Sequence, residues 1–156
     1  MLWGVRVFRG VTNLNIDSKG RVAMPSKYRD RLRESCDGRL VVTVDRDGCL
    51  LVYPLSEWEL IEARLMEYPN LNPQVRRFQR LFMGYATDVD MDGQGRILIS
   101  STLRAEARLN KHAVLVGQGK KFELWDEGLW AAQHDEWLRA DETEGDLSEV
   151  LTSLSL

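Results

Sequence analysis

The chain has 156 residues, of which 44% are hydrophobic and 29% are charged, and its formal net charge is −3 at pH 7. These values are typical of a globular protein and argue against a wholly disordered chain. No apolar run approaches the ~18–20 residues that a membrane-spanning helix needs, so we expect no membrane partner.

The charge is unevenly distributed along the sequence. Residues 1–33 carry eight basic and two acidic side chains. Residues 34–121 carry twelve of each sign, whereas residues 122–156 carry ten acidic side chains and one basic side chain, Arg139. This segregation predicts a basic face, which a phosphate backbone attracts, and an acidic tail.

The N-terminal residues Met1–Arg6 lack the long apolar stretch and the small-residue cleavage site of a signal peptide. Cys36 and Cys49 do not form a Cys-x-x-Cys pair, and the only histidines are His112 and His134. A disulfide framework or a zinc site would need more ligands than these. We therefore expect a cytoplasmic protein with reduced thiols and no metal or other cofactor.

The first predicted element is a strand in which Leu14 and Ile16 alternate with polar residues, a period typical of a half-buried strand. Asp17-Ser18-Lys19-Gly20 is a turn sequence, because Gly adopts positive φ and Asp accepts hydrogen bonds from nearby amides. A short strand over Val22–Met24 follows. Pro25 then predicts the start of a helix, with the proline at its first position.

A hairpin is predicted next, from Leu40–Val44 and Cys49–Tyr53, and two helices follow it. Ser56 and Glu59 form the pattern of a capping box for the first helix. Asn72 is the predicted cap of the second helix. The side chains expected to face inward are Trp58, Ile61 and Leu65 in the first helix and Val75, Phe78, Leu81 and Phe82 in the second.

The same order of elements returns 75 positions later, which indicates an internal duplication. Asp17-x-x-Gly20-Arg21 corresponds to Asp92-x-x-Gly95-Arg96, and Tyr28-Arg29 corresponds to Leu103-Arg104. The second copy is predicted to contain a strand before Asp92, a strand over Ile97–Ile99, a helix capped by Ser100 or Ser101, and a hairpin from Ala113–Val116 and Lys121–Trp125.

A further helix is predicted from about Asp126, with Trp130 and Trp137 on one face, before an acidic run over residues 141–146 that we expect to be solvated and mobile. We divide the chain into a first unit (7–58), bridging helices (59–80), a second unit (81–130), and a C-terminal helix with an acidic tail (131–156). A unit of about 45 residues cannot bury a core alone. The expected fold is therefore α+β, with two intertwined halves that interleave their hairpins into one barrel.

Asn15–Pro25 resembles the first motif of the MraZ family, and Asp92–Arg96 resembles the second. Similar stretches are Arg76–Phe82, Phe122–Trp125 and Leu147–Glu149, so the resemblance extends from about Val7 to the end of the chain. It implies a β-barrel pseudo-dimer of AbrB-type swapped-hairpin domains and the assembly of subunits into a closed ring.

The resemblance also implies a nucleoid-associated transcriptional regulator that binds double-stranded promoter DNA. We expect a repressor that recognises short G-containing direct repeats at the division and cell-wall operon, which includes its own gene. The candidate DNA-binding residues are Arg21, Lys19, Arg9, Arg96 and Lys27, and the candidate loop-structuring residues are Asp17, Gly20, Asp92 and Gly95.

The chemistry of the first loop fits these roles. Arg21 follows a glycine turn at the end of a strand, and its planar guanidinium suits a bidentate bond to guanine or phosphate. Lys19 would add a charge to the phosphate backbone. A carboxylate that faced phosphates would be repelled, so Asp17 is expected to hold the turn. In the alternative reading, the Asp–Arg pair only braces its loop.

Two other functions remain to be weighed. The chain could be an antitoxin-type interaction module whose acidic tail binds a basic protein partner, and DNA binding by a tail-truncated protein would separate the two functions. An enzyme is not expected, because the sequence has no phosphate-binding glycine loop, nucleophile elbow or set of metal ligands. His134, with Asp135 and Glu136 beside it, falls on the exposed part of a helix. No small-molecule substrate is expected.

Overall fold

The computed structural model describes residues 7–69, 71–140 and 147–155. The predictions for residues 1–6 and for the acidic run 141–146 lie outside these residues. The described elements, in chain order, are β1 (Phe8–Asn15), β2 (Arg21–Ala23), α1 (Ser26–Cys36), β3 (Arg39–Val44), β4 (Leu50–Pro54), α2 (Leu55–Glu67), α3 (Pro73–Phe82), β5 (Thr87–Asp90), β6 (Arg96–Leu98), α4 (Ser101–Glu106), β7 (His112–Gly119), β8 (Phe122–Asp126), α5 (Glu127–Arg139) and α6 (Leu147–Ser153).

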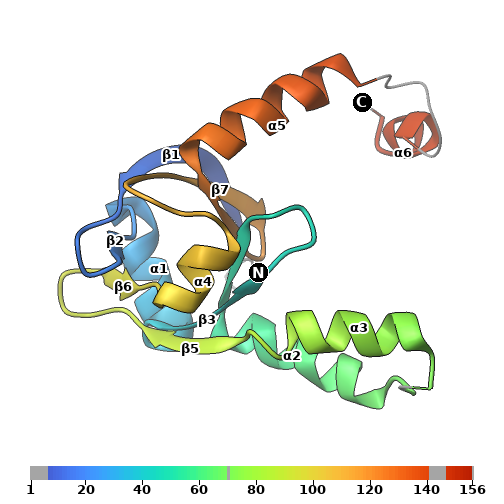
Figure 1. Ribbon diagram of the computed structural model, residues 1–156, viewed down its shortest axis with the longest axis horizontal. Coiled ribbons are helices and arrows are strands. Elements are labelled where there is room, and N and C mark those ends of the chain that lie inside the picture. The colour runs from blue at the N-terminus through green and yellow to red at the C-terminus, as the bar shows by residue number, and fades with distance from the viewer. Residues whose placement is uncertain (1–6, 70, 141–146, 156) are drawn as a thin grey trace.

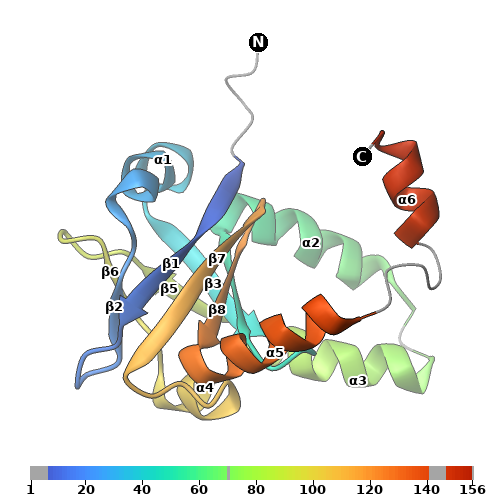
Figure 2. The same ribbon diagram turned by 90° about the horizontal axis from the view of Figure 1, so that it is seen from above.

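Strands from the two copies interleave in a six-stranded antiparallel sheet with the order β1-β7-β8-β4-β3-β5 (Figures 1 and 2). The first strand of each copy pairs with the hairpin of the other copy, β1 with β7 and β5 with β3. The two hairpins meet at the centre, where β4 pairs with β8. The two copies therefore form one sheet and one α+β body.

The predicted closed barrel is not formed in the described part of the chain. β1 and β5 are the edges of the six-stranded sheet, and no pairing joins them. The strands that follow these edges, β2 and β6, pair only with each other, as a separate two-stranded ribbon. The ribbon packs on the sheet through Val22 and Ile97 and does not pair with its edge strands.

The sheet is buried on both faces. Leu40 and Val42 belong to one apolar cluster, which includes residues of the ribbon, α1 and α4. Val41, which points to the other face of β3, belongs to a second cluster with residues of α2, α3 and α5. Two-sided burial explains why the strands of the hairpins read as nearly continuous apolar runs.

Helix starts were predicted correctly where a polar side chain caps the helix and wrongly where a proline is the cap residue. Asn72 accepts a hydrogen bond from the Gln74 amide at 2.7 Å, and Ser100 accepts one from the Leu103 amide at 3.2 Å. The predicted capping box at Ser56 does not form. Pro54 is the cap residue and helix α2 begins directly after it, so Ser56 already lies inside the first turn.

Other local predictions also needed correction. Pro25 is the cap residue of α1, and the helix begins at Ser26. Leu81 was expected to face inward but is 48% exposed, whereas its neighbour Phe82 is buried. Ile16 is buried, yet it lies just beyond the end of β1. Among the described residues, no helix combines the length and the apolar character needed to cross a bilayer.

The central strand pair offers a test of the shared core. Leu124 in β8 is fully buried, whereas Leu60 on α2 is 55% exposed. Leu124→Ala should lower the free energy of unfolding by about 2–5 kcal/mol, because it removes buried methyl groups and leaves a cavity. Leu60→Ala is the matched control and should change it by less than about 0.5 kcal/mol. Urea unfolding measures both, and equal losses would contradict this account of the core.

Candidate nucleic-acid interface

The first Asp-x-x-x-Arg loop is held by hydrogen bonds to one carboxylate. Asp17 Oδ1 accepts hydrogen bonds from the amides of Lys19 at 2.9 Å and Arg21 at 2.8 Å. Asp17 Oδ2 accepts one from Arg21 Nε at 2.8 Å. The Gly20 amide donates to the Asp17 carbonyl oxygen at 3.0 Å, which closes the turn. Asp17 therefore binds both amides of the loop and the Arg21 guanidinium.

The second loop repeats this geometry. Asp92 Oδ1 accepts hydrogen bonds from the amides of Gln94 and Arg96, both at 2.9 Å, and Oδ2 accepts one from Arg96 Nε at 2.9 Å. The Gly95 amide donates to the Asp92 carbonyl oxygen at 3.0 Å. The side chains of Arg21 and Arg96 are also similarly exposed, at 31% and 32%. The two loops thus differ mainly in side-chain chemistry.

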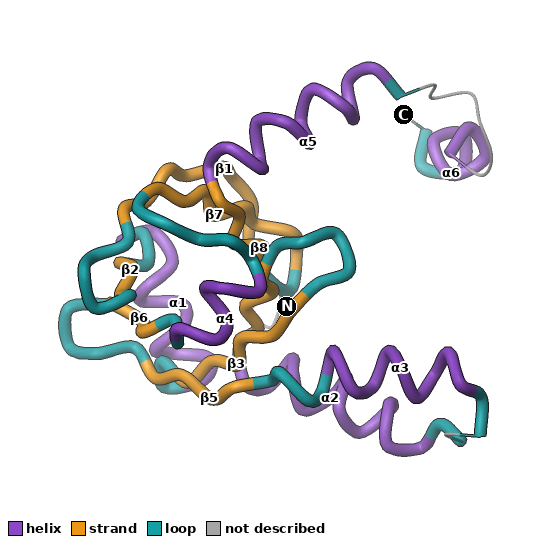
Figure 3. The backbone as a smooth tube through the Cα atoms, viewed as in Figure 1, coloured by secondary structure: helices purple, strands orange, loops and turns teal. Residues whose placement is uncertain are grey.

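The ribbon places both arginines on one face. Its register pairs Arg21 with Leu98, Val22 with Ile97, and Ala23 with Arg96. Val22 and Ile97 are buried against the sheet. Because side chains alternate along a strand, Arg21 and Arg96 both point away from the core, as diagonal neighbours. Figure 3 shows the two turns projecting on the same side of the molecule, beside β2 and β6.

Only one nitrogen of each guanidinium is used within the described structure. Arg21 and Arg96 each bind their aspartate through Nε. No other side-chain hydrogen bond of either arginine occurs among the described residues. The Nη atoms of both side chains can therefore donate to an acceptor outside the protein. If each Asp–Arg pair only braced its loop, these Nη donors would have no role.

The loop hydrogen bonds hold both carboxylates in their charged form. The backbone amide of Arg21 is the largest cause that lowers the pKa of Asp17, with further contributions from the Arg21 side chain and the Lys19 amide, to about 2. The backbone amide of Arg96 likewise lowers the pKa of Asp92. Both aspartates therefore stay ionised, and both orient their arginines, at any pH near neutrality.

Each loop is also locked by an arginine of the other copy. Arg104 of α4 lies against Gly20 of the first loop, so closely that a Cβ added to this glycine would be 2.7 Å from Arg104 Nε. Arg104 Nε donates to the Ile99 carbonyl oxygen at 3.0 Å. The Ile99 amide in turn donates to the Gly20 carbonyl oxygen at 2.9 Å. The first loop is thus fastened to the second copy.

The reciprocal lock has the same geometry. Arg29 of α1 lies against Gly95, where an added Cβ would be 2.9 Å from Arg29 Cζ. Arg29 Nε donates to the Met24 carbonyl oxygen at 2.7 Å, and the Met24 amide donates to the Gly95 carbonyl oxygen at 2.9 Å. Arg29 and Arg104 occupy equivalent positions in the two copies, and no role was predicted for either. These equivalent positions are the feature of the sequence that indicates a shared role for the two arginines.

Arg9 and Lys27 form a separate basic group. Arg9 lies near the start of β1, opposite Gln118, whereas the Asp17 turn follows the other end of this eight-residue strand. Lys27 Nζ lies next to Gly10, and it is 5.0 Å from the centre of the Tyr28 ring. The structure therefore does not bring the five predicted DNA-binding residues into one cluster.

One group of possible metal ligands lies elsewhere, at Asp45, Cys49 and Glu123. Cys49 Sγ is 3.7 Å from Asp45 Oδ2, and Glu123 Oε1 accepts a hydrogen bond from Trp125 Nε1 at 2.9 Å. Burial, together with the nearby carboxylates, raises the pKa of the Cys49 thiol. A protonated thiol is a poor nucleophile.

Comparison with known proteins relates the chain to one family. Residues 7–81 and 81–151 each match the family described as "MraZ protein, putative antitoxin-like". A protein of Thioalkalivibrio sulfidiphilus named transcriptional regulator MraZ is 62% identical over 96% of this chain and 100% of its own length. Proteins with the same name from Methylococcus capsulatus and Pseudomonas aeruginosa are 53% and 52% identical, over 89% and 96% of this chain and 91% and 100% of their own lengths.

The contact between Gly20 and Arg104 predicts that any side chain at position 20 lowers the free energy of unfolding. Gly20 has a φ of +90°, and an added Cβ would also lie 2.8 Å from the Ile99 carbonyl oxygen. Gly48 has a φ of +97° but open space around an added Cβ. Gly48→Ala should therefore cost only the backbone strain, about 1–2 kcal/mol. Gly20→Ala should lower the free energy of unfolding by more than this, as measured by urea unfolding. Equal losses in the two variants would contradict the close packing of Arg104 on Gly20.

Removing the Arg21 side chain should change the titration of one aspartate only. In Arg21→Ala the amide donors remain, so the pKa of Asp17 should rise from about 2 but stay below its ordinary value of 3.8. The pKa of Asp92 in the same protein should not move. Carboxyl-carbon NMR titration measures both, and an unchanged Asp17 pKa would contradict the guanidinium contact.

The sign of the pH effect follows from the lowered pKa. The ionised Asp17 is favoured in the folded state, so its contribution to stability is complete above the unfolded pKa of about 3.9. That contribution is lost as the pH falls through about 2, where the folded-state carboxylate is protonated.

Proposed function

We propose, since the chain belongs to the MraZ family, that it is a sequence-specific DNA-binding transcriptional regulator and not an enzyme. The observation that carries this proposal is the exposed ribbon face on which Arg21 and Arg96 lie together. Its relatives carry the name transcriptional regulator, and promoter DNA is the partner that this name and this face suggest.

Arg21 and Arg96 are proposed to read base edges. A two-stranded ribbon can enter the major groove, where guanine presents two acceptors, O6 and N7, to one guanidinium. Each aspartate fixes the Nε side of its arginine and leaves the Nη atoms free to bond. Because the carboxylate fixes the orientation before binding, less side-chain entropy is lost on contact with DNA.

Lys19, Arg9 and Lys27 are proposed to contact phosphates. The Lys19 side chain lies on the exposed part of the first loop, where the second loop has Gln94. Arg9 and Lys27 lie in their own group on β1 and α1, both exposed, so they would contact the backbone beyond the bases read by the loops. Contacts of this kind set the register on DNA without specifying sequence.

The finer expectations from the family resemblance form part of this proposal. Residues 7–58 and 81–130 would be the two DNA-binding units of a swapped-hairpin pseudo-dimer, joined by bridging helices over 59–80 and followed by the tail at 131–156. Several chains would form a closed ring that binds G-containing direct repeats. Linked loops bind more tightly than one loop pair, because each further contact is intramolecular.

The proposed target is the division and cell-wall operon, including the gene of the protein itself, with repression as the outcome. The protein would then act in the cytoplasm, on the nucleoid. A footprint of the protein on the region upstream of its own gene tests this target directly.

An interaction module of the antitoxin type is the second candidate. It is favoured by the antitoxin-like description of the family and by the acidic C-terminal segment. In this role the tail would bind a basic protein. A protein truncated after Ala140 distinguishes the two functions, since it should keep its promoter affinity only if the loops carry the binding.

The two loops should contribute unequally to DNA binding, because only the first has a lysine beside its arginine and lies within the basic N-terminal segment. Arg21→Ala should weaken specific binding by about 1–3 kcal/mol for each lost bidentate contact. Arg96→Ala should weaken it less. Promoter binding measured alongside thermal unfolding checks both variants, and equal losses in folded proteins would contradict the ranking.

The salt dependence of DNA affinity tests the role of Lys19. If Lys19 contacts a phosphate, Lys19→Ala should reduce the slope of log affinity against log salt by about 0.9 and weaken all sequences alike. Gln94→Lys, the converse change in the second loop, should steepen the slope. A slope that neither variant alters would remove the lysine from the interface.

A further inference from the structure

The second Asp-x-x-x-Arg loop carries an exposed glutamine. Gln94 lies in the turn between β5 and β6, two residues before Arg96. Its backbone amide donates to Asp92 Oδ1 at 2.9 Å, and its side chain makes no hydrogen bond with any residue that the structure describes. The amide group of this side chain can therefore offer two N–H donors and one carbonyl acceptor to a ligand.

The backbone of this second loop is held by a donor that the first loop lacks. Arg33 of α1 donates from Nη2 to the carbonyl oxygens of Asp92 at 3.2 Å and Gly93 at 3.5 Å, the two residues directly before Gln94. Arg108, the equivalent of Arg33 in the second copy, makes no such bond to the first loop within the described ranges. The cause is helix length, because α1 has 11 residues and includes Arg33, whereas α4 has six and ends before Arg108.

The extra donor matters because the two loops carry different chemistry at equivalent positions. Lys19, which takes the place of Gln94 in the first loop, carries a compact charge on a flexible stem, and its attraction to a phosphate depends little on direction. An amide recognises a base only when its donor and its acceptor are both in hydrogen-bonding geometry, which needs a fixed backbone. The loop that carries the amide is the one that Arg33 holds. Position 94 is therefore suited to reading a base.

We infer that Gln94 is a specificity-determining residue that reads an adenine in the major groove. This inference rests on the proposed function, in which the ribbon face enters that groove. Adenine presents the N7 acceptor and the N6 amino donor, which match the NH2 and the carbonyl of one glutamine side chain. Gln94 and Arg96 are two residues apart, so their Cα atoms lie within about 7.6 Å of each other, which is roughly two base-pair steps. The adenine therefore lies close to the base that Arg96 contacts.

The difference between Gln94 and Lys19 also gives the ribbon face a direction. The antiparallel register of β2 and β6 relates Arg21 and Arg96 by a near-twofold axis. The two arginines alone would therefore read a symmetric site in both orientations alike, as twofold proteins do on palindromic sites. An adenine-reading amide in one loop and a lysine in the other remove this equivalence. Each chain should thus bind an asymmetric site in one orientation, as direct repeats require.

Substitution of single base pairs tests this contact. The probe is the duplex upstream of the protein's own gene that the full-length protein protects in a footprint, and each base pair is replaced in turn. Replacing one A·T pair should weaken binding of the unaltered protein by about 5- to 150-fold, the range for one bidentate contact. Gln94→Ala should bind the original duplex more weakly by a similar factor and should not respond to that replacement. Placing 7-deazaadenine, which lacks the N7 acceptor, at this position should weaken binding of the unaltered protein but not of Gln94→Ala.

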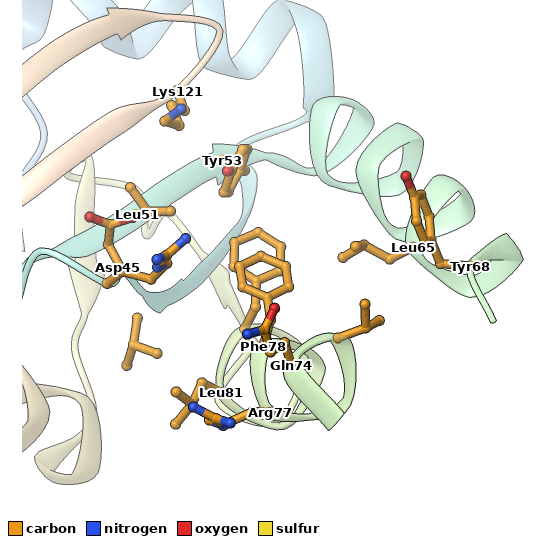
Figure 4. A pocket seen from close by; sticks show the side chains of 14 residues that line it. Asp45, Leu51, Tyr53, Leu65, Tyr68, Gln74, Arg77, Phe78, Leu81 and Lys121 are labelled. Atoms are coloured by element: carbon orange, nitrogen blue, oxygen red, sulfur yellow. The ribbon is translucent and has the colours of Figure 1, made fainter. Parts of the chain in front are cut away.

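An exposed glutamine on the other face of the sheet is the matched control. Gln74 and Leu81 line a groove between the β3–β4 hairpin and the α2–α3 pair (Figure 4). Leu51 and Phe82 in the same lining belong to the apolar cluster on the face away from the ribbon. Gln74→Ala should therefore change neither the affinity nor the base preference. A change equal to that of Gln94→Ala would overturn the inference.

A second variant and the remaining outcomes separate the possible failures. Gln94→Glu should move the preference from adenine to cytosine, whose N4 amino group donates to a carboxylate, and thermal unfolding checks that each variant is folded. If Gln94→Ala weakens all duplexes alike or none of them, or if Gln94→Glu still prefers adenine, Gln94 does not read a base. If binding still depends on Arg21 in that case, only this inference is wrong. If the folded protein protects no DNA, the proposed function fails, and the reading of adenine fails with it.

Discussion

The antiparallel pairing between the two copies is the constraint on which the rest of the molecule depends. The first strand of each copy completes the sheet only by joining the hairpin of the other, β1 with β7 and β5 with β3. A single copy would leave these strands without partners and one side of its hairpin uncovered. Pairing across copies also forces β2 and β6 together as a ribbon. The candidate DNA-binding face therefore exists only when both copies are folded against each other.

The chemistry of this face combines local and long-range constraints. Within each loop, a carboxylate binds two amides and one guanidinium, an arrangement completed over five residues of the chain. Between the loops, Arg29 and Arg104 cross over and pack on the glycine of the opposite copy. The crossed contacts make the two loops one rigid unit. Rigidity of this kind suits recognition, because donors already in position lose little entropy when a ligand binds.

The two loops have nearly the same backbone geometry but different side chains. The loops match in hydrogen bonding, yet Lys19 in the first is replaced by Gln94 in the second. Each copy ends in two helices, but α3 (Pro73–Phe82) of the first copy is longer than α6 (Leu147–Ser153), which has the same place in the second. Duplication within one chain permits this divergence, because each copy can change without altering the other.

The sequence by itself determined the duplication, most strands, the Asp-x-x-x-Arg turns and the caps at Asn72 and Ser100, because each depends on residues a few positions apart. The tertiary structure decided which strands pair, where α2 begins, and that Leu81 borders a groove, because these follow from partners distant in the chain. The sequence also predicted Arg21 and Arg96 as candidate DNA-binding residues. Their common face required the register of β2 against β6, which joins residues about 75 positions apart and which no local pattern encodes.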